Sequence, residues 1–232
     1  MKFLKIVLVS SKYPRNIGLI SRIMSNFAVD QLILVSPQCD LDLEARQGAA
    51  QGQNALENAT IYDSWNEFYE KEPEGLRIGF SRRQGRRRAS VDLPTFLNDK
   101  IIRTDRPTYL IFGAEDHGLS AEDLEMVHRM VHFDLPGELQ SMNLSHSVLV
   151  AVLGFYQKFG QTGEATENQD TIKDPEPFLK LWLEKLNFDL ESQDKWNALT
   201  MLKQLIMKAS PTNEELHKLE MIVRQTIRKL KD

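Results

Sequence analysis

The chain has 232 residues, of which 41% are hydrophobic and 27% are charged, so we expect a packed core and exclude disorder throughout. This length suits one domain of ordinary size plus an appendage. The formal net charge of −4 argues against a generally basic protein that coats nucleic acid, although a local basic patch is compatible with it. No apolar run is long enough to span a bilayer, the N-terminus does not resemble a signal peptide, and the single cysteine, Cys39, excludes an intrachain disulfide. We therefore expect a cytoplasmic protein.

The N-terminal part of the chain predicts a strand–helix–strand unit. Residues 4–9 (LKIVLV) form a continuous apolar run, which is typical of a strand buried on both faces. A polar loop containing Pro14 follows, and apolar residues then recur at helical spacing over residues 17–27, with Asn16 as the candidate N-cap. A second buried strand at residues 32–35 completes a βαβ unit.

Strands and helices continue to alternate up to about residue 160. Such alternation favours an α/β domain with a mostly parallel sheet, in which ligands bind beyond the carboxyl ends of the strands. The remaining predicted helices are one or two at 41–59, then 65–71, 93–99, 121–128 and 144–156, and the strands are 61–62, 76–80, 108–112 and 131–135.

The composition changes after Tyr156. Residues 160–177 are polar and show no apolar periodicity, which is typical of a linker. Three later segments, at 176–186, 192–208 and 212–229, each have one apolar face at helical spacing. We therefore divide the chain into an α/β domain at 1–160, a linker at 161–177 and a helical extension at 178–232.

Three polar loops with glycine or proline fall at the expected carboxyl ends of strands, at residues 10–16, 113–119 and 136–143. The third lies in FDLPGELQSMNLSHSVLVAVL (133–153), where a strand breaks at Pro136-Gly137 and a polar turn leads into an apolar helix. Taken alone, this stretch is more simply an ordinary connection with Ser141 or Asn143 as the N-cap. The three loops together favour a ligand site.

Several familiar sites are not supported. There is no GxxxxGK[ST] phosphate loop, and no GxGxxG follows the first strand. The five histidines lack metal-ligand spacing, so we expect no metal, and we expect His128 and His132 at or near the surface. No serine lies in a nucleophile-elbow sequence.

Three motifs occur in order: N-x-G-x-x-x-R at 16–22, G-x-E-x-x-G-L at 113–119 and S-M-N-L-S at 141–145. Each is weak alone, but the set is specific. On these motifs the chain resembles the SpoU group of the SPOUT RNA ribose 2′-O-methyltransferases. Its start and its helical end resemble the branch that modifies cytidine or uridine in the tRNA anticodon loop. The resemblance is strong to about Tyr156 and looser beyond it.

This resemblance implies a Rossmann-like parallel sheet with a C-terminal deep trefoil knot, although knots are nearly absent from proteins in general. It implies S-adenosylmethionine (SAM) as the cofactor, and a homodimer formed through the knot region. One subunit's Arg22 would then lie near the other subunit's cofactor. The residues that the resemblance places at the cofactor are Phe80, Ser81, Arg82, Gly113, Phe133, Leu135, Ser141, Met142 and Asn143.

The catalytic residues implied by the resemblance are Asn16, Arg22, Glu115, Ser141 and Asn143. Arg22 would bind the phosphate beside the reacting ribose and stabilise oxyanion charge, since an arginine is hard to deprotonate. Glu115 would orient Arg22 or Asn16. The RNA-binding residues would be the five arginines Arg82, Arg83, Arg86, Arg87 and Arg88, for which a solvated loop is the alternative.

The expected function is SAM-dependent methylation of a ribose 2′-hydroxyl in tRNA, in the anticodon loop. The alternatives are a ribosomal RNA 2′-O-methyltransferase, a knotted RNA-binding protein without transfer activity, and an unrelated α/β enzyme that binds ATP or NAD. The third motif departs from the family pattern, because it reads FDLP before the turn and has Met142 in place of the commoner leucine.

Overall fold

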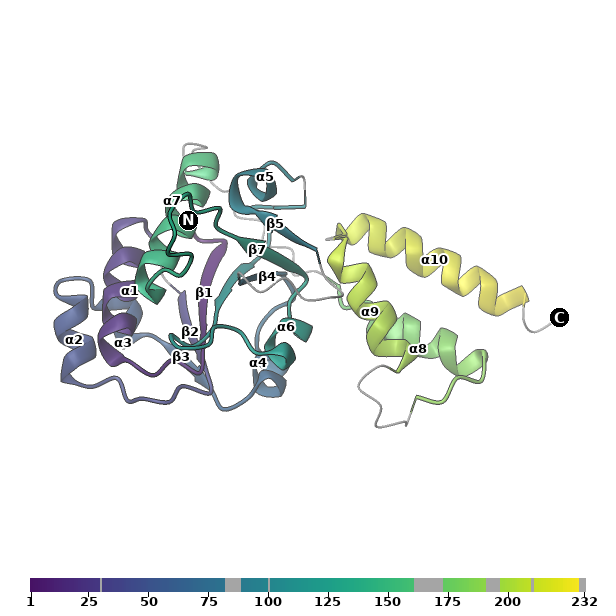
Figure 1. Ribbon diagram of the computed structural model, residues 1–232. Coiled ribbons are helices and arrows are strands. Elements are labelled where there is room, and N and C mark those ends of the chain that lie inside the picture. Colours follow the sequence, from purple (N-terminus) through teal and green to yellow (C-terminus); the bar gives the residue numbers. More distant parts are fainter. Residues whose placement is uncertain are drawn as a thin grey trace.

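The computed structural model describes residues 1–29, 31–81, 89–99, 101–160, 173–190, 197–209 and 211–229. Up to residue 160 the chain forms a sheet covered by helices on both faces, and three further helices lie to one side of it (Figure 1). Within the described ranges, no helix has the length and apolar character needed to cross a membrane.

The described part of the domain contains one seven-stranded sheet in the order β3-β2-β1-β6-β4-β7-β5. Every neighbouring pair is parallel, which confirms the predicted sheet type. The strands are β1 Leu4–Val9, β2 Gln31–Val35, β3 Thr60–Tyr62, β4 Leu76–Phe80, β5 Ser90–Asp92, β6 Thr108–Phe112 and β7 Arg129–His132. The sequence did not predict β5, and β7 ends at His132 rather than at Leu135, so Phe133 to Leu135 belong to the following loop.

The helices of this domain cover the two faces of the sheet. They are α1 Pro14–Asn26, α2 Leu43–Ala49, α3 Asn54–Glu57, α4 Trp65–Lys71, α5 Leu93–Leu97, α6 Ala121–Glu125 and α7 Leu144–Phe159. One apolar cluster packs α1 and α7 on the face that carries Leu4, Ile6 and Leu8 of β1. The other face carries Val7 and Val9 and packs against α4. Because both faces are covered, β1, β4 and β6 are buried along their whole length.

Helix α1 begins earlier than its apolar periodicity indicated. Pro14 occupies its first turn, where the missing N–H is no loss, and Tyr13 is the N-cap. The prediction that Asn16 caps this helix is therefore wrong, since Asn16 lies inside the first turn. Gly18 does allow a close backbone approach, but to α2: an added Cβ would lie 1.9 Å from the carbonyl oxygen of Ala45.

Helices α8 (Glu176–Lys185), α9 (Ala198–Lys208) and α10 (Asn213–Lys229) follow. Helix α8 begins before the end of the predicted linker. The three helices share an apolar cluster of their own, which includes Phe178, Leu179, Val223 and Ile227 and is separate from the two clusters of the sheet. Below, these helices together are called the helical unit.

Candidate functional site

A cavity of about 580 Å³ opens at the carboxyl ends of β4, β6 and β7. Such an edge of a parallel sheet is where α/β proteins bind ligands, and this volume lies within the usual range for small-molecule sites. Seven of the residues expected at the cofactor line the cavity: Phe80, Ser81, Gly113, Phe133, Leu135, Ser141 and Met142. Three distant stretches of the sequence are thus brought together at one place.

Aromatic rings form one wall of the cavity. The ring of Phe80 stacks on Phe112 with centroids 4.6 Å apart and on Phe133 with centroids 5.3 Å apart. Phe80 and Phe112 are the last residues of neighbouring strands paired in register, and Phe133 directly follows β7. The stack therefore presents an apolar, flat-sided surface beside polar loops, an arrangement suited to a ligand with a planar ring.

The loop after β6 is closed tightly by its two glycines. The N–H of Gly118 donates to the carbonyl of Ala114 at 2.8 Å, and a Cβ on Gly113 would lie 2.1 Å from the carbonyl carbon of Gly118. Gly118 itself has a φ of 68°, which favours glycine. This closure turns Glu115, Asp116 and the rest of the loop toward the cavity, which they line.

Glu115 holds the loop after β1. Its carboxylate accepts hydrogen bonds from the backbone N–H of Lys12 at 3.0 Å and of Tyr13 at 3.4 Å, and from Nδ2 of Asn16 at 3.0 Å. Of the two partners expected for Glu115, Asn16 is therefore the one in contact. These three bonds fix the position at which α1 leaves the sheet.

Asn143 completes the connection among the three motifs. Its Nδ2 donates to Oδ1 of Asn16 at 3.2 Å. Its own Oδ1 accepts from the N–H of Ser145 at 2.8 Å, so Asn143 is the N-cap of α7. The side chains of Glu115, Asn16 and Asn143 thus form a continuous hydrogen-bonded chain, which we call the three-motif bridge. Asn143 does not line the cavity, whereas its neighbours Met142 and Leu144 do.

Charged groups lie at the rim beside Glu115. The carboxylate of Asp116 contacts Nζ of Lys12 at 2.6 Å and Nδ1 of His117 at 2.6 Å. The hydrogen bond from Lys12 lowers the pKa of Asp116 to about 2, and the same contact raises the pKa of Lys12. The Lys12–Asp116 pair therefore keeps both charges across the neutral pH range.

Arg22 does not reach the large cavity of its own chain. It lies on the exposed side of α1 and lines a smaller cavity of about 260 Å³ with Arg15, Leu19 and residues of α2. Among the described residues, no hydrogen bond or ion pair holds its guanidinium. The expected RNA-binding residues Arg82, Arg83 and Arg86–Arg88 lie outside the described residues, as does the cofactor role expected for Arg82.

Part of the cavity wall was not expected from the sequence. His132, Gln140, Leu144 and Ser147 line it, as do Phe112 and the neighbours of Glu115 in the loop after β6 (Ala114, Asp116, His117 and Gly118). The position of His132 at the carboxyl end of a strand was an available signal. Its Nδ1 lies 2.8 Å from Oγ of Ser90 on the neighbouring strand.

His128 was expected near the surface and is instead buried, with 6% of its surface exposed. Burial first, and the charge of Arg77 second, lower its pKa well below the usual value. Within the described ranges, no group of histidine, cysteine, aspartate and glutamate side chains is arranged to hold a metal ion.

Comparison with known proteins places these motifs in a family. Residues 4–153 match the model of the SpoU rRNA Methylase family. The chain is 30% identical over 156 residues to the tRNA (cytidine-2'-O-)-methyltransferase TrmJ of Methanocaldococcus jannaschii, covering 67% of this chain and 68% of that protein.

Two solved structures are also similar. TrmJ from Z. mobilis ZM4 has a TM-score of 0.68 at 21% identity, covering 98% of this chain and 99% of that one, and so shares the fold. A structure reported as "Structural insights into the 2-OH methylation of C/U34 on tRNA" has a TM-score of 0.56 at 26% identity, covering 68% of this chain and 96% of that one. With most of its α/β domain matched, the chain belongs to the SpoU rRNA Methylase family.

Proposed function

We propose that this protein transfers a methyl group from SAM to the 2′-hydroxyl of a ribose in the anticodon loop of tRNA. The observation that carries the proposal is the three-motif bridge, which joins all three family motifs beside one cavity. The names of the similar proteins support the substrate, since they describe tRNA 2′-O-methylation and, in one case, nucleotide 34.

The cavity fits SAM in size and chemistry. The aromatic stack of Phe80, Phe112 and Phe133 suits an adenine ring, and the turns at Gly113 and Ser141 offer backbone groups to its polar atoms. We assign cofactor contacts to the seven lining residues named above, and on the family pattern also to Arg82 and Asn143. When bound, SAM supplies the methyl group on a sulfonium; binding and orientation fall to the chain.

The chain must align the ribose oxygen with the methyl group, assist the loss of its proton and exclude water. We assign Arg22 to the phosphate beside the reacting ribose, where it stabilises developing oxyanion charge. Glu115 already accepts three N–H groups, so its role is to hold the loop after β1 in place. Ser141 lies at the cavity, and Asn16 and Asn143 keep the motifs in register.

The position of Arg22 supports a homodimer in which this residue serves the partner subunit's cavity. Helix α7 offers an apolar surface for the contact: Leu149, Val150, Leu153 and Tyr156 are each between 36% and 42% exposed. An apolar strip of this kind on an otherwise packed helix is typical of a protein interface.

We also propose the trefoil knot for the segment after β7. Helix α7 packs against α1, α5 and β6, and its contact with the connection that carries α5 supports this proposal. The helical unit, which begins with α8 at Glu176, would then be the extension predicted at 178–232, joined through the linker predicted at 161–177. The Arg82–Arg88 cluster would contact RNA phosphates, and the protein would act in the cytoplasm, where tRNA is found.

The test is transfer of labelled methyl from SAM to bulk tRNA and, in a parallel reaction, to ribosomal RNA, with Arg22→Ala and, as a matched control, Arg224→Ala on exposed α10. We expect transfer by the wild type and by Arg224→Ala. Transfer by Arg22→Ala should fall by about 10²–10³-fold with SAM binding unchanged. Label in ribosomal RNA alone would support the ribosomal alternative. If neither RNA is labelled although SAM binds, the alternative that remains is a knotted RNA-binding protein that has no transfer activity.

A further inference from the structure

Charged and polar groups contribute to the contact between the helical unit and the α/β domain. Its own apolar cluster is separate from the two clusters of the sheet. The contacts between the two parts include an ion pair from Lys203 of α9 to Glu74 and a hydrogen bond from Nη1 of Arg106 to the carbonyl of Pro211 at 2.8 Å. Polar junctions of this kind hold parts of a chain together less permanently than apolar ones.

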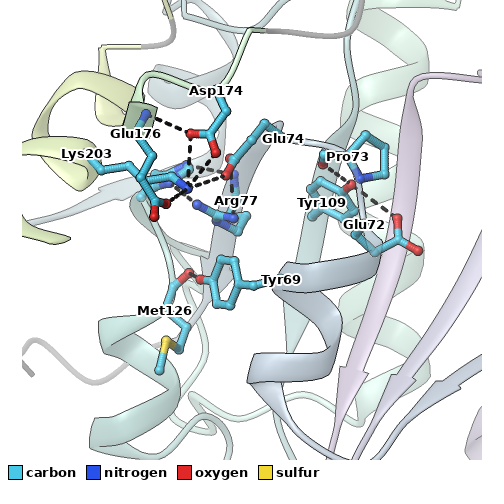
Figure 2. Close-up of polar contacts among 11 residues, drawn as sticks. Tyr69, Glu72, Pro73, Glu74, Arg77, Tyr109, Met126, Asp174, Glu176 and Lys203 are labelled. Atoms are coloured by element: carbon cyan, nitrogen blue, oxygen red, sulfur yellow. Dashed lines mark hydrogen bonds and ion pairs between the residues drawn. The ribbon is translucent and has the colours of Figure 1, made fainter. Parts of the chain in front are cut away.

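Lys203 is the centre of the junction, as Figure 2 shows. Its Nζ lies 2.9 Å from Glu176, the first residue of α8, and 3.1 Å from Asp174, two residues earlier. It lies 3.7 Å from Glu74, which precedes β4. The Lys203 side chain is only 25% exposed, so water screens these charges less than it would on an open surface.

Glu74 is the group that anchors Lys203 to the α/β domain. Its side chain is 16% exposed, and Oε2 lies 3.6 Å from Nη1 of Arg77 on β4. Arg77 is itself held firmly: its guanidinium lies over the ring of Tyr69 at 4.3 Å, and Nη2 lies 2.7 Å from Nε2 of His128 (Figure 2 shows Tyr69 below Arg77). Because these contacts fix Arg77, they also hold the carboxylate of Glu74 in a defined position.

The contact from Lys203 to Glu74 is long for a hydrogen bond and therefore acts mainly through charge. The cluster joins three carboxylates (Glu74, Asp174 and Glu176) with two cations (Lys203 and Arg77). Without Lys203, Glu74 would face Asp174 and Glu176 with Arg77 as its remaining cationic partner among the described residues. Repulsion would then oppose docking.

We propose that Lys203 is an electrostatic latch that docks the helical unit on the α/β domain, and that the unit undocks without unfolding when this latch is lost. The latch sets where the helical unit lies relative to the large cavity. This proposal does not depend on the proposed methyl transfer.

The experiment measures docking in the full-length protein by small-angle X-ray scattering at low and high salt, and folding of the helical unit by hydrogen–deuterium exchange. We compare Lys203→Met with Lys218→Met, whose lysine pairs with Glu214 within α10 and, among the described residues, forms no ion pair with the α/β domain. We expect Lys203→Met to increase the undocked population roughly tenfold and to raise the radius of gyration. Amides of α10 should stay protected, and Lys218→Met should match the wild type.

Glu74→Gln is the decisive second variant, because it removes the charge contact of Lys203 with the α/β domain and leaves the contacts of Lys203 with Asp174 and Glu176 intact. We expect it to undock the helical unit as Lys203→Met does, and the double variant to resemble either single one. Wild-type scattering for both single variants would overturn the latch, as would additive effects in the double variant. Loss of amide protection throughout α8–α10 in both would also overturn it, since the charges would then be needed for folding.

Discussion

Replacing Asn16 by aspartate tests the three-motif bridge with almost no change of shape. Asn16 is 9% exposed and donates through Nδ2 to Glu115 at 3.0 Å. In Asn16→Asp, that donor becomes a carboxylate oxygen facing another carboxylate. The variant loses a hydrogen bond to a charged group, which contributes about 1.5–3 kcal/mol. It also gains a repulsion of about 5 kcal/mol at an effective dielectric constant of roughly 20.

Relaxation of the loop and uptake of a proton reduce the repulsion between the two carboxylates. We therefore expect Asn16→Asp to lower the free energy of unfolding by about 2–4 kcal/mol at pH 8. Because one shared proton relieves the repulsion, the loss should shrink when the same measurement is made at pH 5. Urea denaturation followed by circular dichroism measures both values.

The matched control is Asn26→Asp, an exposed asparagine at the end of the same helix. It introduces the same charge away from Glu115, and we expect it to cost less than about 1 kcal/mol. If Asn16→Asp proved as mild as Asn26→Asp, or if its effect were the same at both pH values, the bridge would not join the motifs as described.

Three further predictions concern the cavity and the buried cluster. Gly113→Ala should lower the free energy of unfolding by about 1–3 kcal/mol, because the new Cβ would lie 2.1 Å from the backbone of Gly118. The melting temperature measures this loss, and an unchanged value would contradict the tight closure of the loop after β6. Phe80→Leu should weaken SAM binding about tenfold in calorimetry, whereas Phe68→Leu on the far face should not, and equal effects would argue against the aromatic wall. Burial lowers the pKa of His128, so as the pH falls below about 6.5 the unfolded chain takes up a proton that the folded chain does not, and the free energy of unfolding decreases. His128→Gln should therefore lose stability less steeply than the wild type from pH 7 to 5. Equal slopes for the two proteins would contradict the burial of a neutral His128.

The regular part of the fold could be predicted from the sequence, because buried strands and amphipathic helices carry strong periodic signals. The apolar runs at β1, β4 and β6 correspond to strands that the structure buries completely. Strand β5 could not be predicted, since Ser90–Asp92 is too short to show alternation and is defined by pairing with β7. The sequence predicted too late a start for helix α1, because the first turn of this helix is polar. The preference of proline for the first turn of a helix would have indicated the earlier start.

Seven of the residues that line the cavity were predicted as cofactor contacts through the family resemblance. The exact partners were not predictable, because hydrogen bonds between distant loops depend on three-dimensional placement. Asn16 is the clearest case: its contact with Glu115 was one of two alternatives, its hydrogen bond with Asn143 was not expected, and its predicted helix cap is wrong. His128 was misplaced for a similar reason, since its burial depends on Arg77 and the neighbouring strand.

The central claim is that the large cavity holds SAM for transfer to a tRNA ribose. The most direct test incubates the purified protein with SAM carrying a deuterated methyl group and unmodified tRNA, followed by nuclease digestion and mass spectrometry of the anticodon fragment. We expect a deuterated methyl on the ribose 2′-oxygen of one anticodon-loop nucleotide, and we expect it to be lost in Arg22→Ala. A methyl group found on a base, or no deuterated fragment from any tRNA, would contradict it.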